Sequence, residues 1–389
     1  MLICKENMNR PIIIIGANLT GLCTALALSR LNQPSILIDK KDLLNNAKDF
    51  RAIALSYGSK QILEQIGLWS ALEPYAGPIK QIRVTDQYSP LFLHFNNNET
   101  LGYLVESHDL QRIAYEHVAK DPNITIFSNT AYELLENNYD QITIRIHDKI
   151  YSTNLLIAAD GKFSHLRKLA NIKHLSHNYK QTAIVCRLQH QLPHDNIAQE
   201  IFLPNGPFAI LPLKNPNQSG IVWTETPEIA DSLMLLEKDK FSYFLNQKFT
   251  DYLGEINLIG EIISYPLELI LAEKYYYNRI MLIGDSAHSI HPIAGQGFNL
   301  GLRDIDALTS LYSKYQNLGL ELGCYQSLKE YETLRMQDNL NMAAITDSLN
   351  KLFSNNLAPL SILRKLGLAC VEQIPPLKKF FMEYAMAKK

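Results

Sequence analysis

The sequence lacks any uninterrupted apolar stretch of the roughly 18 or more residues that a membrane-spanning helix needs. Near the N-terminus, the apolar run Pro11–Ile15 stops at Gly16 and is too short for the core of a signal peptide. We therefore expect a soluble cytoplasmic protein. Its closest approach to lipid would be peripheral contact with the inner face of the cytoplasmic membrane.

Paired cysteines and an excess of charge are also missing. The five cysteines form no C-x-x-C pair, and they lie at Cys4, Cys23, Cys186, Cys324 and Cys370. An odd, dispersed set fits a reducing compartment better than a disulfide framework or a zinc site, so we expect no metal. The net charge of −2 gives no electrostatic reason to expect a nucleic-acid partner.

What is present is enough apolar sequence for a substantial core. The chain has 389 residues, of which 47% are hydrophobic and 20% charged. That length exceeds the usual size of one domain, so we expect two closely packed domains. No repeat or low-complexity linker separates them.

The first pattern is a βαβ unit. Ile12–Ile15 is a continuous β-branched run, as in a strand buried on both faces of a parallel sheet. Leu19–Leu31 has helical spacing, and Ser35–Ile38 is a second buried strand that ends at Asp39.

The loop between the first strand and the helix predicts a dinucleotide site. Gly16 permits a tight turn, and Gly21 lets the helix pack closely on the sheet. Amide groups at the helix N-terminus would face a pyrophosphate, and Asp39, followed by Lys40, is placed to bind a ribose. The expected ligands in this loop are Gly16, Ala17, Asn18, Leu19, Thr20 and Gly21.

Asn18 replaces the middle glycine of the usual pattern, and we expect it to be tolerated because Asn adopts unusual backbone conformations more readily than most residues. Two alternatives remain open. The loop is either a nucleotide site or a βα turn with coincidental glycines, and it does not by itself distinguish FAD from NAD.

The middle of the chain changes character. Gln181–Gln189 and Gly220–Thr226 are strand-like, and prolines are expected to mark the turns between short strands. Those prolines are Pro204, Pro207, Pro212 and Pro216. We predict an antiparallel sheet that forms a second domain. Arg279–Gly284 then returns to a buried parallel strand, and a mainly helical final quarter follows.

The segment Met281–Asp304 is the most informative. A strand ends at Gly284, Asp285 follows, and a glycine-rich loop leads into a helix at about Gly297. A carboxylate at a strand end suits the hydroxyls of an extended linker such as ribitol. A glycine-rich helix N-terminus suits a ring edge that becomes anionic, as reduced flavin does.

This segment resembles the flavin site of the p-hydroxybenzoate hydroxylase class, GD-x-A-H-x-x-x-P-x-x-G-Q-G-x-N. The stretch Ala158–Lys168 resembles the third motif of that class, whose Asp-Gly pair, here Asp160 and Gly161, lies near both FAD and the incoming nicotinamide. The resemblance implies non-covalent FAD on an α/β, Rossmann-like domain interleaved with a smaller α+β antiparallel-sheet substrate domain. The implied flavin contacts are Gly284, Asp285, Pro292, Gly295, Gln296, Gly297, Phe298 and Asn299.

Simpler readings of these residues are open. Asp285 would then only cap a turn, and Asp160-Gly161 would be an ordinary turn. His288 and His291 are three positions apart, as metal ligands can be, but no further ligand is near them in sequence. Pro292 also forces an extended conformation on His291.

Further stretches resemble the ubiquinone-biosynthesis hydroxylases, and within them the branch that acts on 2-octaprenyl-6-methoxyphenol. They are Asp49–Trp69, Leu101–Leu110, Gln181–Val185, Leu203–Leu213 and Tyr265–Leu269. The resemblance covers nearly the whole chain and implies that Arg51 reaches the pyrophosphate while Ser107 and Gln111 line the cofactor. Alternatively, Arg51 is a solvated residue before an apolar helix. Asp285 stands where this branch often carries Asn, which leaves room for a sister enzyme acting at another ring position.

The resemblance also implies a reaction. NAD(P)H, bound transiently, would reduce FAD, and O₂ would add to give a flavin hydroperoxide that hydroxylates an electron-rich phenol. The loop with Pro292, Gly295, Gln296 and Gly297 would form the catalytic wall and exclude water. No side chain is a convincing general base, so we expect catalysis by positioning.

The implied substrate carries a polyprenyl tail, and the implied setting includes a multiprotein ubiquinone-biosynthesis complex. The stretch Leu352–Lys389 mixes apolar residues with lysines and so suits an anionic bilayer surface. It equally suits a helix whose apolar face docks on the protein core.

Three rival functions remain. One is a geranylgeranyl-reductase-like flavoenzyme, another is a hydroxylase of small soluble aromatics, and the third is a non-enzymatic FAD-bound scaffold. In every case the predicted division is an FAD domain of residues 1–75, 103–177 and 271–345, a substrate domain of residues 76–102 and 178–270, and a C-terminal helical segment of residues 346–389.

Overall fold

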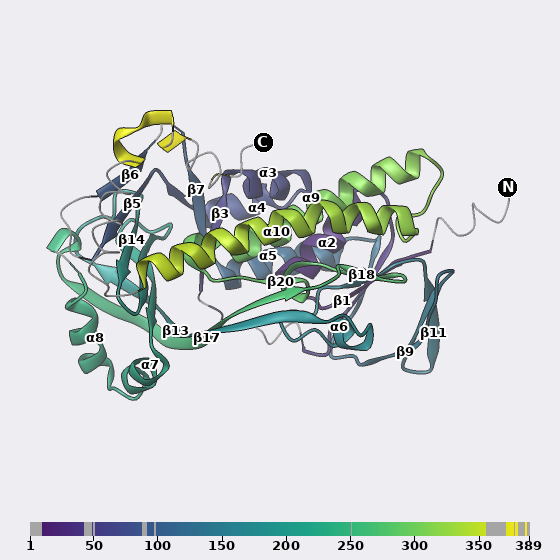
Figure 1. Cartoon of the computed structure of the whole chain (residues 1–389), viewed down its shortest axis with the longest axis horizontal. Helices are drawn as coiled ribbons and strands as arrows, with labels where there is room; N and C mark the ends of the chain where they lie inside the picture. Colours follow the sequence, from purple (N-terminus) through teal and green to yellow (C-terminus); the bar gives the residue numbers. More distant parts are fainter. Residues whose placement is uncertain are drawn as a thin grey trace.

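The structure is a computed structural model. It describes residues 10–42, 49, 51–87, 92–96, 99–249, 251–354, 371–376, 378–379 and 386. The molecule is elongated, with one lobe built on a mostly parallel sheet and the other on a large, mostly antiparallel sheet (Figure 1). The predicted α/β class, with an interleaved antiparallel-sheet domain, is confirmed.

The first lobe is built around β1, which lies in the middle of the parallel sheet. The order of the described strands is β18 (Tyr276–Tyr277), β19 (Ile280–Leu282), β12 (Leu156–Ala158), β1 (Ile12–Ile15), β2 (Ser35–Ile38) and β8 (Ile124–Phe127). Every residue of β1 is buried, as its continuous apolar run predicts. Helices α2 (Leu19–Arg30), α5 (Ser107–Lys120) and α9 (Gln296–Asn317) share one core with the sheet.

The second lobe is an eight-stranded sheet among the described residues. Its order is β20 (His288–Ser289), β17 (Ile256–Ala272), β13 (His174–His190), β16 (Gln218–Glu225), β15 (Gly206–Pro212), β14 (Ile197–Leu203), β5 (Gln81–Asp86) and β6 (Phe92–Asn96). The strands β13 and β17 have 17 residues each and run between the lobes (Figure 1).

The expectation that prolines mark turns between short strands is wrong for Pro207 and Pro212, which both lie within β15. Pro207 is the second residue of the strand and Pro212 the last, so neither interrupts the centre of the ladder.

Helices cover one face of this sheet. α7 (Pro227–Met234) and α8 (Lys238–Asn246) pack on it through a core cluster that includes Phe208, Trp223 and Phe241. Its other face turns toward a small antiparallel sheet in the order β3 (Ala52–Ser56), β7 (Gly102–Glu106) and β4 (Gly77–Ile79). The two lobes meet between the large sheet and this small sheet.

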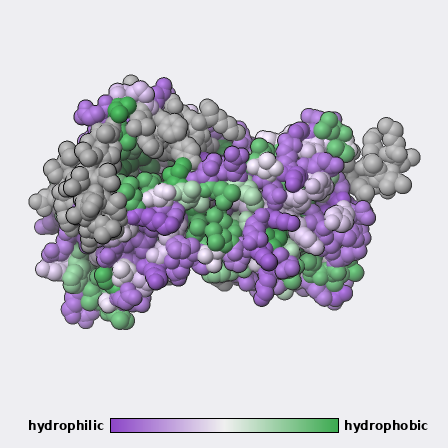
Figure 2. Space-filling model, viewed as in Figure 1, coloured by the Kyte–Doolittle hydropathy of each residue, from purple (hydrophilic) through white to green (hydrophobic). Residues whose placement is uncertain are grey.

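α10 (Tyr325–Phe353) crosses both lobes along the long axis (Figure 1). Its buried face is unusually polar and includes Arg335, Asn339 and Asn350, while Leu334 and Leu340 are about half exposed. Figure 2 shows hydrophobic side chains gathered over the middle of this helix and the strands beside it. α10 is continuous through residue 346, where we placed the start of the C-terminal segment, and the domain division stays a prediction.

Shorter elements complete the described chain. They are α3 (Tyr57–Gln65), α4 (Trp69–Leu72), η1 (Glu73–Tyr75), β9 (Tyr132–Asn137), β10 (Ile142–Ile146), β11 (Lys149–Thr153), α6 (His165–Leu169), η2 (Asp251–Leu253), η3 (Gly284–Ser286) and η4 (Ile293–Gly295). No helix within the described ranges is both long enough and apolar enough to cross a bilayer. Most of the predicted C-terminal helical segment lies outside the described residues.

Candidate active site

The loop after β1 has the backbone constraints of the predicted nucleotide turn. Gly16 has a φ of 101°, and a Cβ there would lie 2.3 Å from the carbonyl oxygen of Ala159. A Cβ at Gly21 would lie 1.8 Å from the carbonyl oxygen of Gly16. Both positions therefore require glycine, for the turn and for close packing of α2 respectively.

Asn18 is accommodated differently from our expectation. Its φ of −81° is extended rather than left-handed, so the tolerance of Asn for unusual backbone conformations is not used. Instead it is the N-cap of α2, and its Oδ1 accepts a hydrogen bond from the backbone N–H of Leu19 at 2.8 Å. Asn18 is exposed and so remains accessible to a ligand.

Asp39 ties this loop to the end of β2. Its carboxylate accepts hydrogen bonds from the backbone N–H groups of Ala17 at 2.7 Å and Lys41 at 2.8 Å. Each oxygen keeps a further lone pair for the ribose we predict here. The side chain of Lys40 is exposed beside it.

The second motif, Met281–Asp304, packs against α2 near its start. Gly284 has a φ of 61°, and a Cβ there would lie 2.9 Å from the hydroxyl oxygen of Thr20. A Cβ at Gly301 would lie 3.2 Å from the same oxygen. The two predicted flavin segments, far apart in sequence, are therefore packed together at Thr20.

Asp304 anchors the second motif from within. Its carboxylate accepts hydrogen bonds from the backbone N–H of Gly284 at 2.9 Å and from Arg335 Nε at 2.6 Å, and it lies 2.6 Å from His288 Nε2. Burial opposes ionisation, but the charges of His288 and Arg335 hold the pKa of Asp304 well below its ordinary value. The carboxylate is therefore charged and fixes the turn that presents Asp285.

Asn299 holds the start of α9. Its Oδ1 accepts from the backbone N–H of Ser56 at 2.9 Å and the hydroxyl of Ser59 at 2.6 Å. Its Nδ2 donates to the carbonyl oxygens of Ala54 at 2.8 Å and Gly295 at 2.9 Å. These bonds use the full capacity of the side chain, so its backbone N–H is the group available to a cofactor.

Arg51 and Ser107, predicted from separate motifs, meet at Asp49. Arg51 Nε donates to Asp49 Oδ1 at 2.7 Å, and the Ser107 hydroxyl donates to Asp49 Oδ2 at 2.9 Å. The hydrogen bond to Asp49 raises the pKa of Arg51, and the charges of Tyr265 and Asp285 raise it further. Arg51 is thus part of a charged cluster, although its side chain is 45% exposed. Gln111 lies one turn further along α5 and is half-buried.

Asp285 faces solvent on one side and protein on the others. Its side chain is exposed, yet the surrounding protein withdraws enough water to raise the pKa of its carboxyl, against the charges of His288, Arg51 and Lys162. An exposed carboxylate that is partly desolvated by its neighbours suits hydroxyl groups as hydrogen-bond donors. That agrees with the ribitol contact that we predict.

The two carboxylate oxygens of Asp160 differ in their hydrogen bonding. Oδ2 accepts hydrogen bonds from the backbone N–H groups of His165 at 2.8 Å and Leu166 at 3.1 Å, and so caps α6. Oδ1 is buried and has no hydrogen-bond partner among the described residues. Arg167 braces this turn against η3, because its NH1 donates to the carbonyl oxygen of Ser286 at 2.6 Å.

Space for a cofactor lies beside two glycines, one in each downstream motif. A Cβ at Gly161 or Gly297 would meet no described atom within 4 Å, whereas a Cβ at Gly295 would lie 2.8 Å from that of Ala54. Open backbone at Gly161 and Gly297, the unpartnered Asp160 Oδ1 and the exposed carboxylate of Asp285 fit the pyrophosphate, ribitol and ring of FAD. Gln296 and Phe298 flank Gly297, and Pro292 opens η4.

The comparisons with known proteins agree with this geometry. The model of the FAD binding domain family matches residues 9–319. Ubiquinone hydroxylase UbiL of Rhodospirillum rubrum is 39% identical over 96% of this chain and 89% of that protein. The chain belongs to the ubiquinone hydroxylase family of FAD-binding proteins.

A further relative and two solved structures are also similar to this chain. The 3-demethoxyubiquinol 3-hydroxylase of Escherichia coli is 29% identical over 98% of this chain and 99% of that protein. Among solved structures, p-nitrophenol 4-monooxygenase PnpA of Pseudomonas putida superposes with a TM-score of 0.80 at 16% identity, over 97% of this chain and 98% of that one. The Klebsiella pneumoniae HpxO complex with FAD and uric acid gives 0.75 at 16% identity, over 98% and 97%. These likenesses confirm the fold.

His291 belongs to a network that the sequence did not reveal. Its Nδ1 accepts a hydrogen bond from the backbone N–H of Ile293 at 3.3 Å, and its Nε2 lies 3.1 Å from Gln181 Oε1. Asn350 Nδ2 donates to the same Gln181 oxygen at 3.0 Å. In this family member, α10 is therefore linked through β13 to the loop that begins at Pro292.

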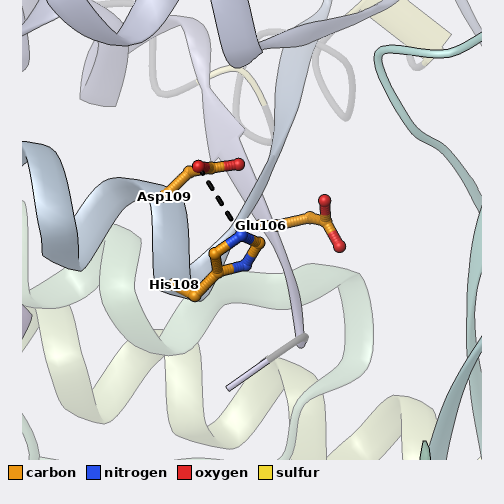
Figure 3. A group of neighbouring side chains, drawn as sticks. All are labelled: Glu106, His108 and Asp109. Atoms are coloured by element: carbon orange, nitrogen blue, oxygen red, sulfur yellow. Dashed lines mark ion pairs between the residues drawn. The ribbon is translucent and has the colours of Figure 1, made fainter. Parts of the chain in front are cut away.

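The open alternative of a metal site at His288 and His291 has no support in these contacts, because the two imidazoles join separate networks. A different cluster, at the start of α5, brings Glu106, His108 and Asp109 together (Figure 3). Its carboxylates already have cationic partners, since Glu106 pairs with Arg187 at 2.8 Å and Asp109 with Arg112 at 3.1 Å. We therefore assign no metal to it.

Proposed function

We propose that this chain is an FAD-dependent monooxygenase that hydroxylates the aromatic ring of a polyprenylated phenol in ubiquinone biosynthesis. The observation that carries the proposal is the packing of three separated motifs, at Gly16 against Ala159 and at Thr20 against Gly284, with open backbone at Gly161 and Gly297, in a chain of the ubiquinone hydroxylase family. The activity favoured over a reductase or a scaffold is hydroxylation, because the relatives named above are hydroxylases.

Different residues hold different parts of FAD. The α2 N-terminus and Arg51 bind the pyrophosphate, Asp39 binds the adenosine ribose, and Asp285 binds the ribitol. Asp160 and Gly161 lie along the pyrophosphate, and Ser107 and Gln111 line the cofactor. When bound, the flavin supplies the transfer of electrons from the reductant to O₂.

The loop Pro292–Gly297 performs the positioning. Backbone N–H groups at the start of α9, from Gln296 to Asn299, would hold the flavin ring and favour negative charge on it. Pro292 and Gly295 would present backbone rather than bulky side chains to the bound cofactor. Ile293, packed with Phe202 and Phe353, keeps water away from this side of the loop.

The reductant is NAD(P)H, bound transiently. A single complete dinucleotide fold, the one used by FAD, is visible in the described chain, so the nicotinamide cofactor approaches a surface near Asp160-Gly161. The substrate is of the 2-octaprenyl-6-methoxyphenol type, and Asp285 is consistent with a sister enzyme acting at a neighbouring ring position.

A prenylated substrate favours peripheral contact with the inner face of the cytoplasmic membrane and membership of a biosynthetic complex. The apolar and lysine-rich stretch of residues 352–389 is the candidate surface. Two of its described residues, Phe353 and Met386, are instead buried in core clusters. Part of the stretch therefore docks on the protein, and the remaining residues carry the membrane contact.

The test is stopped-flow reduction of the purified holoenzyme by NADH or NADPH, with and without a short-tailed 2-methoxyphenol. We expect the phenol to accelerate flavin reduction, and aerobic turnover to yield a hydroxylated phenol. A flavin that neither reductant reduces would support the scaffold. Reduction of a prenyl double bond without use of O₂ would support the reductase.

A further inference from the structure

β14 presents alternate side chains to the two faces of the large sheet. Ile201 and Leu203 point into the cluster that packs under α7 and α8. Ala198 and Phe202 belong instead to clusters on the opposite face. Because side chains alternate along a strand, Glu200 lies on the same face as Ala198 and Phe202, between them.

That face is the one turned toward the flavin loop. Ala198 packs in a cluster with Ala54, whose Cβ is the atom that a Cβ at Gly295 would approach to 2.8 Å. On the other side of Glu200, Phe202 packs with Ile293 of η4. Glu200 is thus bracketed by contacts to both ends of the Ile293–Gly295 turn.

Glu200 has an apolar setting. Its cross-strand neighbours are Ala209 on β15 and Val84 on β5, neither of which offers a side-chain donor. The structure gives it no hydrogen bond or ion pair with any described residue. Burial alone raises the pKa of its carboxyl to about 7.

No neighbouring charge contributes to that shift. The charged and titratable residues of the same face and of the elements packed against it include Tyr57 beside β3, Asp86 on β5, Glu106 on β7, Arg187 on β13, His291 before η4, Asp347 and Lys351 on α10, and Glu372 and Lys378 near the C-terminus. Arg187 is paired with Glu106, Lys351 with Asp347 and Lys378 with Glu372.

We infer that Glu200 accepts the phenolic proton of the substrate during ring hydroxylation. The inference rests on the proposed function and deepens it. A phenol ring placed between the sheet and the loop would direct its hydroxyl toward this unpaired carboxylate. No side chain is recognisable as a general base from the sequence, and the fold brings Glu200 to the loop from a strand of the second lobe.

The proton transfer is balanced as follows. The phenolic O–H bond breaks, its proton forms an O–H bond to a Glu200 carboxylate oxygen, and the electron pair stays on the phenolic oxygen and enriches the ring. One oxygen atom of O₂ enters the ring as a hydroxyl group, and the other leaves as water. NAD(P)H supplies two electrons together with one hydrogen, and solvent supplies two protons. The ring carbon then loses its hydrogen as a proton to solvent, and Glu200 returns its proton to the product, so that one proton is consumed overall. A carboxyl that titrates near neutral pH is suited to both transfers.

The experiment compares wild-type holoenzyme with Glu200→Gln and with a control, Glu261→Gln, in which the exposed carboxylate lies on β17 of the same sheet. A short-tailed 2-methoxyphenol is bound to each oxidised holoenzyme, and its phenolate absorbance is followed from pH 5 to pH 9. We expect the bound phenolate signal in the wild type and the control, and its loss in Glu200→Gln, with FAD content unchanged.

Turnover is measured on the same proteins. We expect hydroxylation to fall on the order of 100-fold in Glu200→Gln and to stay unchanged in the control. Wild-type phenolate absorbance and rates in Glu200→Gln would overturn the role of Glu200 while leaving the proposed function intact. Absence of hydroxylated product from the wild type would contradict the proposed function, and the inference with it.

Discussion

Gly16 lies between β1 and α2, and Gly297 lies in the first turn of α9, and the protein constrains the two glycines differently. Gly16 is held in a left-handed conformation against Ala159, whereas a Cβ at Gly297 would meet no described atom. The first glycine is therefore required by the fold. Gly297 is required only if a ligand occupies the space beside it. A substitution at this position therefore tests the cofactor site directly.

We predict that Gly297→Ala leaves the free energy of unfolding of the apoprotein within about 1 kcal/mol of the wild type, because alanine favours the first turn of α9. FAD affinity should fall at least about tenfold, since the methyl group would enter the cofactor's space. Fluorescence titration with FAD and urea unfolding of the apoprotein measure the two effects. Gly16→Ala is the contrasting variant and should lower both the free energy of unfolding and the affinity for FAD. Wild-type FAD affinity in Gly297→Ala would contradict the assignment.

Asp304 is a residue whose importance is visible only in the structure. We predict that Asp304→Asn lowers the free energy of unfolding by about 3 kcal/mol, because it leaves the buried Arg335 without one of its carboxylate partners. Asp231→Asn, an exposed position on α7, serves as the control.

The pH dependence of this effect has a definite sign. The folded pKa of Asp304 is depressed, so its stabilisation is present above the ordinary carboxyl pKa of about 4 and is lost as the pH falls further. The urea midpoints of wild type and Asp304→Asn should approach each other as the pH falls. A difference below about 1 kcal/mol in the free energy of unfolding at pH 7 would show that the network around Asp304 contributes little to stability.

At the scale of helices and strands, features that depend on neighbouring residues were predictable from the sequence, and features that depend on distant residues were not. The β1–α2 turn was predictable because glycine spacing and a β-branched run act within a few residues. The links of η4 to β13 and α10 were not, because Gln181 and Asn350 are 169 positions apart and neither has a sequence signal. Glu200 was missed for the same reason. Asp49 is only two positions from Arg51, but its hydrogen bond with Ser107, 58 positions away, has no sequence signal.

We predict that His291 contributes a specific pH dependence to stability. Burial lowers its pKa to about 4, so between pH 6.5 and pH 4 the unfolded chain binds a proton that the folded chain does not. Stability should therefore fall as the pH decreases through this window, by about 3 kcal/mol from this group.

The measurement is the urea midpoint of wild type and His291→Asn from pH 4 to pH 7. We expect a shallower acid slope in the variant. His190 and His194 also have lowered pKa values and remain in both proteins, so they cancel in the comparison. An identical slope in the two proteins would contradict a buried neutral imidazole at position 291.

At the scale of the whole molecule, the fold class and the packing of the two predicted flavin segments against each other were predictable from motifs, whereas the face of the second lobe that packs against the loop Pro292–Gly297 was not. Alternation along β14 is readable in sequence, but which face meets the flavin loop depends on how β3, η4 and α10 pack against the sheet. The long strands β13 and β17 and the helix α10 join the two lobes and set that packing (Figure 1).

The central claim is that the chain transfers one oxygen atom from O₂ to a prenylated phenol. The most direct test is aerobic turnover of the FAD-loaded protein under ¹⁸O₂, with NAD(P)H and a short-tailed 2-methoxyphenol, followed by mass spectrometry of the phenol. We predict one labelled oxygen in the new ring hydroxyl, dependent on FAD. Consumption of NAD(P)H with only hydrogen peroxide formed, or a hydroxyl without label, would contradict the account.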